Sequence, residues 1–212
     1  MKLKQLFVGI GVCFLCGSAS ALDFQVSDAN FKQCLNALAE KNNWASFDAV
    51  TKIECHSKNI TVLDGLEKFS QLQSLSLYNN QISKASLKNI PNLRQLNLAK
   101  NSLTSFELSG VPALEELYIF NNKLVALELT KLPKLKLLKA NENQFLTFTY
   151  SDLPELEKIY IFNNKMVDFD INHLPKLHYM DCRQNPMPDK LYDEMNAKKG
   201  VTYLHDGNAK DW

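Results

Sequence analysis

The sequence lacks the short motifs that mark catalytic and phosphate-binding sites. Its 212 residues include only 7 glycines, which form neither a phosphate-binding loop nor a G-x-S-x-G elbow. The 4 histidines are not arranged as H-E-x-x-H, and the cysteines beyond residue 21 are not spaced as C-x-x-C. We therefore expect a protein that is not an enzyme and that binds no metal ion and no cofactor.

The sequence also lacks a surplus of either charge. Lys and Arg together number 24, Asp and Glu together number 23, and like charges do not form runs. Because nucleic acids and anionic membranes select strongly basic surfaces, neither is expected as a partner. With 45% hydrophobic residues, the chain can form a core of its own.

A long apolar run occurs only in the first 21 residues. Two lysines precede the run LFVGIGVCFLCG of 12 residues, and the small residues SASA follow it. Ala19 and Ala21 fit an A-x-A cleavage site, so the segment is typical of a secretory signal peptide. The predicted mature protein begins at Leu22. It is secreted or periplasmic and does not insert into a membrane.

Two other interpretations of residues 1–21 fit less well. An N-terminal membrane anchor would need a longer apolar run to span a bilayer. A lipoprotein would use Cys13 or Cys16, but Val12 and Leu15 precede these cysteines where a small residue is required.

The hexapeptide YIFNNK occurs at 118–123 and again at 160–165, because it belongs to a repeat of 21 residues. Successive copies begin at Leu72, Leu93, Leu114, Leu135, Leu156 and Leu177. Counted from that leucine, positions 1, 4, 6, 11, 14, 16 and 19 are apolar in nearly every copy, and position 20 is proline in the complete copies. Position 9 is always asparagine, at Asn80, Asn101, Asn122, Asn143, Asn164 and Asn185.

The pattern L-x-x-L-x-L-x-x-N resembles the leucine-rich repeat, a family of solenoid proteins. It covers residues 50–187 in about seven repeats of 21–22 residues. The resemblance implies an α/β-type solenoid that is mainly β, with a parallel sheet on its concave face. The alternation of positions 3 to 7 agrees with one half-buried strand per repeat.

The six asparagines are interpreted as structural. A side-chain amide at position 9 can bind main-chain groups that the turn after each strand leaves without partners. Positions 11 to 16 also alternate, as in LTSFEL, LVALEL, FLTFTY and MVDFDI, so a second short extended segment is expected on the convex side. Asp168 and Asp170 in the last segment have no counterparts in other repeats, which argues against a ladder of calcium sites.

The ends of a solenoid expose its core and need caps. Residues 22–49 are predicted to form a helical cap, begun by Ser27 or Asp28. The segment FQVSDANFKQCLNALAE and the repeat after it resemble the start of the internalins of pathogenic bacteria. Residues 188–212 are predicted to form the second cap, with a short helix from Pro188 to a stop at Gly200 and one further strand in VTYLHDG.

Three cysteines follow the signal peptide. Cys34 lies on the apolar face of the predicted cap helix, and Cys55 occupies an inward position of the first repeat, so we expect a disulfide between them. Two buried free thiols are the alternative. Cys182 occupies position 6 and is interpreted as a reduced core residue.

Positions 3, 5 and 7 point away from the core, so both aromatic residues of each YIFNNK should lie on the concave face. Exposed aromatic clusters mark interaction surfaces. A duplication of two repeats, with the preference of strands for aromatic residues, is the alternative explanation. The predicted ligand-binding residues are Tyr78, Tyr118, Phe120, Lys139, Asn141, Tyr160, Phe162, Tyr179 and Arg183.

These features predict a secreted, monomeric recognition protein whose concave face binds a protein or a glycan. The resemblance to internalins implies that the ligand is a host protein. A structural protein of the cell envelope, without a specific ligand, is the alternative function.

Overall fold

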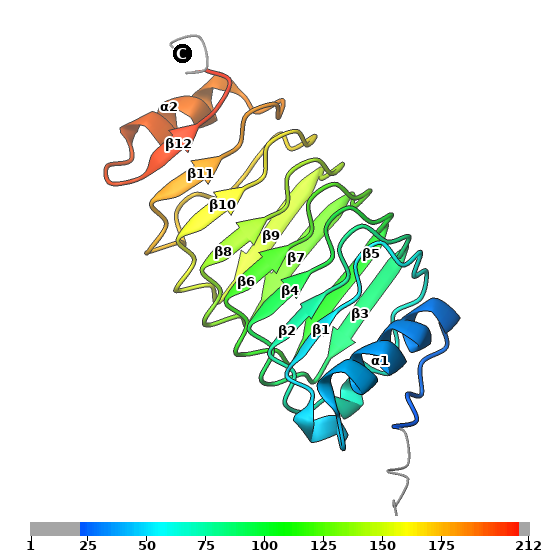
Figure 1. The fold of residues 1–212 in the computed structure, drawn as a ribbon. Helices are drawn as coiled ribbons and strands as arrows, with labels where there is room; N and C mark the ends of the chain where they lie inside the picture. The colour runs from blue at the N-terminus through cyan, green and yellow to red at the C-terminus, as the bar shows by residue number, and fades with distance from the viewer. Residues whose placement is uncertain (1–21, 208–212) are drawn as a thin grey trace, which may run out of the picture.

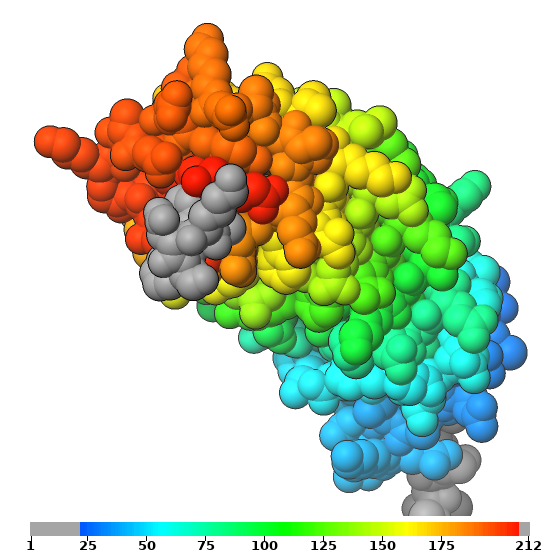
Figure 2. Space-filling view, turned by 90° about the horizontal axis from the view of Figure 1, so that it is seen from above, coloured from blue at the N-terminus to red at the C-terminus, as the bar shows by residue number. Residues whose placement is uncertain are grey.

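The computed structural model describes residues 22–207, which form a solenoid of stacked coils (Figure 1). The predicted signal peptide, residues 1–21, lies outside this part of the chain. One helix lies at the N-terminal end of the stack, and a second helix with the last strand lies at the C-terminal end. The space-filling view shows bands of colour that follow one another along the long axis, as expected when each coil packs on its neighbours (Figure 2).

One parallel sheet of eight strands runs through the solenoid. Its strands, in order, are β1 (Lys52–Glu54), β2 (Ser74–Ser76), β4 (Gln95–Asn97), β6 (Glu116–Tyr118), β8 (Leu137–Lys139), β10 (Lys158–Tyr160), β11 (Tyr179–Asp181) and β12 (Thr202–Leu204). The same repeat positions lie side by side, since Tyr118 pairs with Asn97 on one side and with Lys139 on the other. The predicted solenoid with a parallel concave sheet is therefore confirmed.

The core is a column of side chains from positions 4 and 6 of each repeat. All of them have an exposed fraction of 0%: Leu75, Leu77, Leu96, Leu98, Leu117, Ile119, Leu138, Ala140, Ile159, Ile161, Met180 and Cys182. A shift of one residue would have sent positions 3 and 5 into the core instead. The predicted strand register is confirmed, and it places positions 3, 5 and 7 on the concave side.

The asparagine at position 9 ties each coil to the one before it. Nδ2 of Asn122 donates to the main-chain oxygens of Leu98 and Ile119, at 3.1 and 3.0 Å, and Oδ1 accepts from the N–H of Leu103 at 2.9 Å. The same three bonds recur at the buried residues Asn80, Asn101, Asn143, Asn164 and Asn185. This ladder gives partners to main-chain groups that would otherwise be buried without any, at a cost of about 1–3 kcal/mol each.

The convex side has shorter stretches of sheet. Strands β3 (Lys84–Lys88) and β5 (Ser105–Ser109) form one pair, and β7 (Ala126–Thr130) and β9 (Thr147–Ser151) form another. The prediction of a second extended segment is confirmed for these repeats.

The prediction is wrong for MVDFDI, because residues 166–171 form no strand beside β9. Oδ1 of Asp168 accepts from the N–H of Phe169, and Oδ1 of Asp170 accepts from the N–H of Asn172, both at 2.8 Å. Side chains that bind the main chain of their own segment compete with strand pairing. The convex sheet therefore ends at β9.

Helix α1 (Ala29–Asn42) closes the N-terminal end of the core (Figure 1). Asp28 is its N-cap, with Oδ1 accepting from the N–H of Phe31 at 2.9 Å. Oδ2 accepts from the N–H and hydroxyl of Thr61, both at 2.8 Å, so one carboxylate joins the helix to the first repeat. Burial raises the pKa of a carboxyl group, but bonds from Thr61, Phe31 and Val62 outweigh it and lower the pKa of Asp28 to about 2.

A disulfide joins Cys34 of α1 to Cys55, which directly follows β1, with 6.0 Å between the Cα atoms. In the chain-entropy model a loop of 21 residues makes such a bond worth about 3 kcal/mol. A short 3₁₀ helix, Phe47–Ala49, lies between α1 and β1, and a second one, Leu66–Lys68, lies between β1 and β2. The disulfide at Cys34 and the hydrogen bonds of Asp28 at the helix N-terminus therefore hold α1 against the first repeat at two points.

Helix α2 (Asp189–Ala197) covers the other end, with Leu191, Tyr192 and Met195 buried. Pro188 is its N-cap residue, but the helix ends at Ala197 and not at Gly200. Gly200 has a φ of 82°, which is a turn conformation that leads into β12.

Candidate functional site

The concave face is densest in aromatic side chains over β6, β8, β10 and β11. In the four repeats that contain these strands, positions 5 and 7 are aromatic in one repeat and polar in the next. Half-buried side chains at these strands are Tyr118, Phe120, Lys139, Tyr160, Phe162 and Tyr179. Half-burial leaves part of each side chain accessible, so together they form one accessible surface, which we call the aromatic surface.

Lys139 lies at the centre of the aromatic surface. Its Nζ lies over the ring of Tyr118, 5.7 Å from the centroid, and over the ring of Tyr160, 5.1 Å from the centroid. Such cation–π contacts are worth about 0.5–1 kcal/mol each at exposed sites. The second neighbour of Tyr160 is Tyr179, with ring centroids 5.3 Å apart. Lys139 therefore orders the two tyrosines that the repeated hexapeptide supplies.

A chain of hydrogen bonds fixes the Tyr118 hydroxyl. It donates to Oε2 of Glu116 at 2.8 Å, and Nε2 of Gln95 donates to the same oxygen at 2.8 Å. Burial raises the pKa of Tyr118 to about 12, and the charge of Glu116 acts in the same direction. The hydroxyl thus stays protonated near neutral pH, and the side chain is held in one orientation before any ligand arrives.

Arg183 and Asp181 form a paired group at the C-terminal edge of the aromatic surface. Nε and NH2 of Arg183 donate to the two carboxylate oxygens of Asp181, at 2.9 and 2.7 Å. Asp181 is buried, whereas the Arg183 side chain is 47% exposed. The hydrogen bond to Asp181 raises the pKa of Arg183, which remains a cation. Its exposed part can meet a ligand.

The structure does not bring all predicted residues together. Asn141 is only 8% exposed, so little of its side chain reaches the concave surface, and its role as a ligand-binding residue stays a prediction. It is a short side chain between the same positions of the neighbouring repeats, which hold Phe120 and Phe162. Tyr78 is accessible but forms a separate group with Lys100, whose Nζ lies 5.5 Å from the ring centroid.

The repeat pattern does not predict the roles of Glu116 and Lys100. Lys100 contacts Tyr78, which lies one repeat earlier. Glu116 accepts hydrogen bonds from Gln95, one repeat earlier, and from Tyr118 on its own strand. The spacing of the repeat could have indicated both contacts, since residues 21 or 22 apart in the sequence lie side by side in this fold.

The aromatic surface offers rings, hydrogen-bonding groups and charges, which are the groups used in recognition. Cys182, the free thiol within residues 22–207, lies in the core, where burial raises its pKa to about 12 and keeps it protonated near neutral pH. Across residues 22–207, His, Cys, Asp and Glu side chains form no cluster of three that could hold a metal ion. Neither helix in this part of the chain is long and apolar enough to cross a bilayer.

Comparison with known proteins agrees with this geometry. Residues 91–131 match the family model for Leucine Rich repeats (2 copies), and residues 71–93 match the model for a single Leucine Rich Repeat. No curated protein matches the chain.

Two of the similar solved structures illustrate the likeness. Internalin C2 from Listeria monocytogenes matches 84% of this chain and 93% of its own, with 18% identity and a TM-score of 0.51. TLR13, from the TLR13–ssRNA13 complex, matches 65% of this chain with 25% identity and a TM-score of 0.54. The chain spans only 22% of that TLR13 chain, so the likeness concerns a stretch of solenoid.

Proposed function

The chain is a leucine-rich repeat protein with the fold of the internalins, and on that premise we propose that its aromatic surface binds a protein ligand. The observation that carries the proposal is the ordered pair Tyr118 and Tyr160 around Lys139, with Tyr179 packed beside Tyr160. Half-buried aromatic side chains with fixed orientations lose little entropy on binding, and such residues dominate the energetics of protein interfaces. We propose a binding protein, not an enzyme.

The geometry favours a protein over a glycan. A sugar ring would stack on an open aromatic face, but Lys139 lies over faces of Tyr118 and Tyr160. Tyr179 packs beside Tyr160 as well. These contacts leave less open ring face for stacking on a sugar, whereas the ring edges can still pack against side chains of a protein.

The charges favour a protein over a nucleic acid. Lys139, Lys158 and Arg183 lie on the concave side of β8, β10 and the segment after β11, together with Glu116 and Asp181. A groove for single-stranded nucleic acid combines stacking faces with a clear positive excess. Here the acidic and basic groups nearly balance, and Asp181 neutralises Arg183 locally.

We also propose that the protein acts outside the cytoplasm, in the periplasm or after secretion. Support comes from the signal-peptide pattern in residues 1–21 and from the Cys34–Cys55 disulfide, since disulfides persist in oxidising compartments. A host protein as ligand follows from the likeness to internalins and belongs to this proposal. A structural role in the envelope is the alternative, and it would not need an ordered aromatic surface.

A double substitution tests the proposal. Tyr118→Ala with Tyr160→Ala should weaken binding of the captured ligand by about 1–4 kcal/mol, because both ring contacts of Lys139 are lost. The measurement is affinity capture with the mature protein, followed by titration of the captured protein. The control is Val125→Ala with Val167→Ala, which changes exposed apolar residues on the other side of the solenoid.

The valine variant should unfold within about 0.5 kcal/mol of the wild type, as usual for surface substitutions. The tyrosine variant should stay folded but lose about 1–2 kcal/mol of stability, because two cation–π contacts with Lys139, worth about 0.5–1 kcal/mol each, are removed. If the tyrosine variant binds the ligand as tightly as the valine variant does, the aromatic surface is not the binding site.

A further inference from the structure

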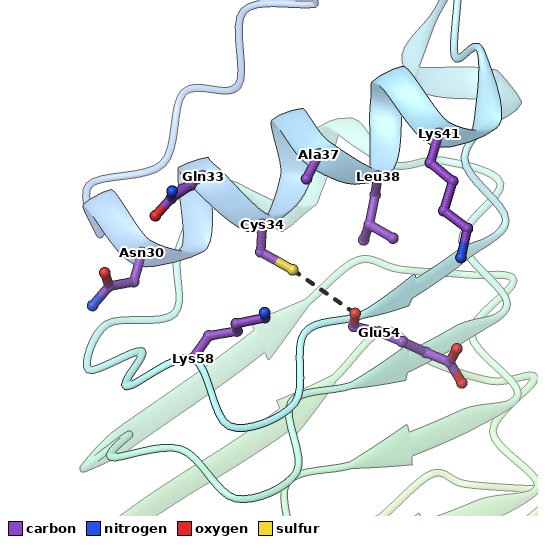
Figure 3. A pocket seen from close by; sticks show the side chains of 8 residues that line it. All are labelled: Asn30, Gln33, Cys34, Ala37, Leu38, Lys41, Glu54 and Lys58. Carbon is purple, nitrogen blue, oxygen red and sulfur yellow. Dashed lines mark hydrogen bonds between the residues drawn. The ribbon is translucent and has the colours of Figure 1, made fainter.

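One hollow outside the aromatic surface, of about 380 Å³, lies between α1 and β1 and belongs to the N-terminal cap (Figure 3). Its wall includes Cys34, whose Sγ lies 3.8 Å from the main-chain oxygen of Glu54 and is bonded to Cys55. The disulfide holds α1 over this edge of the sheet, which is therefore covered. The convex side is different, because it carries exposed apolar side chains.

Three of these exposed apolar side chains lie next to one another, at position 12 of consecutive repeats. Val125, Leu146 and Val167 are 46, 52 and 59% exposed. The N–H of Leu146 donates to the main-chain oxygen of Val125 at 2.8 Å, and Leu146 and Val167 line one hollow. They form a continuous line, which we call the apolar row. Single exposed apolar residues are normal in folded proteins, but a contiguous group marks an interaction surface.

A hollow of about 360 Å³ lies beside the apolar row, between β9 and residues 167–170. Phe148 and Phe169 line it, with ring centroids 5.4 Å apart, and both are nearly buried. Thr147 and Thr149 line it as well. A protruding row next to a hollow is a surface that can pack on a second copy of itself, because each row can enter the hollow of the other copy.

Opposite charges flank the apolar row on its two sides. Position 10 of the same three repeats holds Lys123, Gln144 and Lys165, and position 15 holds Glu128, Thr149 and Asp170, all of them exposed. Lys123, Lys165 and Glu128 form no ion pair with any residue from 22 to 207. Asp170 contacts His173, with Oδ2 and Nδ1 2.6 Å apart, and its side chain is 48% exposed. One flank is thus basic and the other acidic, and both have a neutral residue in the middle.

This charge pattern distinguishes two ways of packing the row on a second copy. If the two solenoids run in opposite directions, position 10 meets position 10 and lysines face lysines. If they run in the same direction, related by a two-fold axis along the row, position 10 of one copy faces position 15 of the other. Lys123 then faces Glu128 of the second copy and Lys165 faces its Asp170, so the like-charge cost is avoided and every charge gains a partner.

We propose that the apolar row is the interface of a homodimer in which two solenoids run in the same direction about this two-fold axis. Leu146 and Val167 of each copy enter the hollow of the other, and the basic and acidic flanks meet on both sides. The aromatic surfaces lie on the concave side and stay free, so the dimer presents two of them. This association replaces the monomer expected from the sequence and does not depend on the proposed function.

The dimer is expected to be weak. The three repeats span only about 10 Å along the row, so the contact is smaller than the roughly 800 Å² per partner of stable complexes. We expect dissociation in the micromolar range. At the submicromolar protein concentrations of a ligand titration the chain is then monomeric, so the valine control for the aromatic surface is unaffected.

The first test is sedimentation equilibrium of the mature chain, which should show a reversible dimer. Leu146→Ser should raise the dissociation constant at least tenfold, because the substitution occurs twice in each dimer. The matched control is Val62→Ser, at a side chain that is 45% exposed but belongs to the first repeat. It should dimerise as the wild type does.

A charge swap tests the orientation of the two copies. Lys123→Glu alone and Glu128→Lys alone should each raise the dissociation constant at least tenfold, because like charges then face each other twice. An equimolar mixture of the two variants should dimerise like the wild type, since every facing pair in the mixed dimer is opposite in charge. The control is Lys134→Glu, at an exposed lysine in the same repeat as Lys123 but away from the row, which should dimerise normally.

Three results would overturn the proposal. The first is a chain that stays monomeric at concentrations up to about 1 mM. The second is a mixture of the two charge variants that dimerises no better than either variant alone, which would exclude this orientation. The third is a monomer that binds phosphatidylglycerol vesicles and loses this binding in Leu146→Ser, which would identify the apolar row as a membrane-surface site.

Discussion

The concave and convex sides of this solenoid are built from the same repeats, yet they differ in continuity. On the concave side eight strands form one sheet, whereas on the convex side four strands form two separate pairs. Both sides carry alternating apolar side chains. Alternation alone is therefore not sufficient for a continuous sheet.

The difference lies in which main-chain groups the polar side chains bind. Asn122 binds the repeat before its own, and Asp28 links α1 to Thr61 of the first repeat. Asp168 and Asp170 bind N–H groups of their own segment. Hydrogen bonds from polar side chains to a neighbouring coil thus join the coils, whereas hydrogen bonds within one segment accompany the end of strand pairing.

The largest effect should come from the core beneath the concave sheet. Ile119→Ala removes a fully buried side chain and should lower the free energy of unfolding by about 2–5 kcal/mol through the cavity that it leaves. Urea denaturation measures this change. Val125→Ala, at a side chain that is 46% exposed, is the control and should change stability by less than about 0.5 kcal/mol. Similar losses in both variants would contradict the strand register.

The second effect should come from the ladder. Asn122→Ala leaves Leu98, Leu103 and Ile119 each without one hydrogen bond and should cost about 1–3 kcal/mol in urea denaturation. Asn92→Ala is the matched control, because Asn92 also donates to a main-chain oxygen, at 2.8 Å, but is exposed. An unchanged midpoint for Asn122→Ala would mean that water replaces the amide without loss.

The third effect depends on pH. The pKa of Asp28 is lowered to about 2, so its contribution is present above the unfolded pKa, near 4, and is lost as the pH falls toward 2. Asp28→Asn should therefore lower the free energy of unfolding by about 2 kcal/mol at pH 7, because the amide lacks the charge and has an NH₂ group where the carboxylate accepts bonds from Thr61 and Val62. Near pH 2 the carboxyl group has lost most of this contribution, so the substitution should cost little. Urea denaturation at both pH values checks this. A cost that is equal at both would show that the charge is unimportant.

The smallest effect should appear at the end of the convex sheet. Asp168→Ala with Asp170→Ala frees the N–H groups of Phe169 and Asn172 and should let residues 168–172 pair with β9. Stability should change by less than about 0.5 kcal/mol, whereas hydrogen exchange of these amides should slow. Unchanged or faster exchange would mean that another contact keeps this segment out of the sheet.

The sequence predicts whatever depends on the period of the repeat. The buried positions, the concave sheet and the Asn ladder follow from it, as Ile119 and Asn122 illustrate. It does not predict what depends on the size of neighbouring side chains or on local competition. Asn141 is buried between larger residues, and Asp168 binds the N–H of Phe169 in a segment that alternates but forms no strand.

At the candidate site, the contacts of Lys139 likewise could not be predicted from the sequence. The repeat places it on the strand between Tyr118 and Tyr160, but only the structure shows its ammonium group over both rings.

The asparagine ladder also has a direction. Asn122 completes the turn at Leu103, which precedes it by 19 residues in the chain. During synthesis on the ribosome, a coil therefore stays unfinished until the asparagine at position 9 of the next repeat has emerged. α1, by contrast, is made early and can close the first end while the rest is still being added. Folding should thus advance from the N-terminus, with each coil completed about halfway through the synthesis of the next and with α2 closing the last coil.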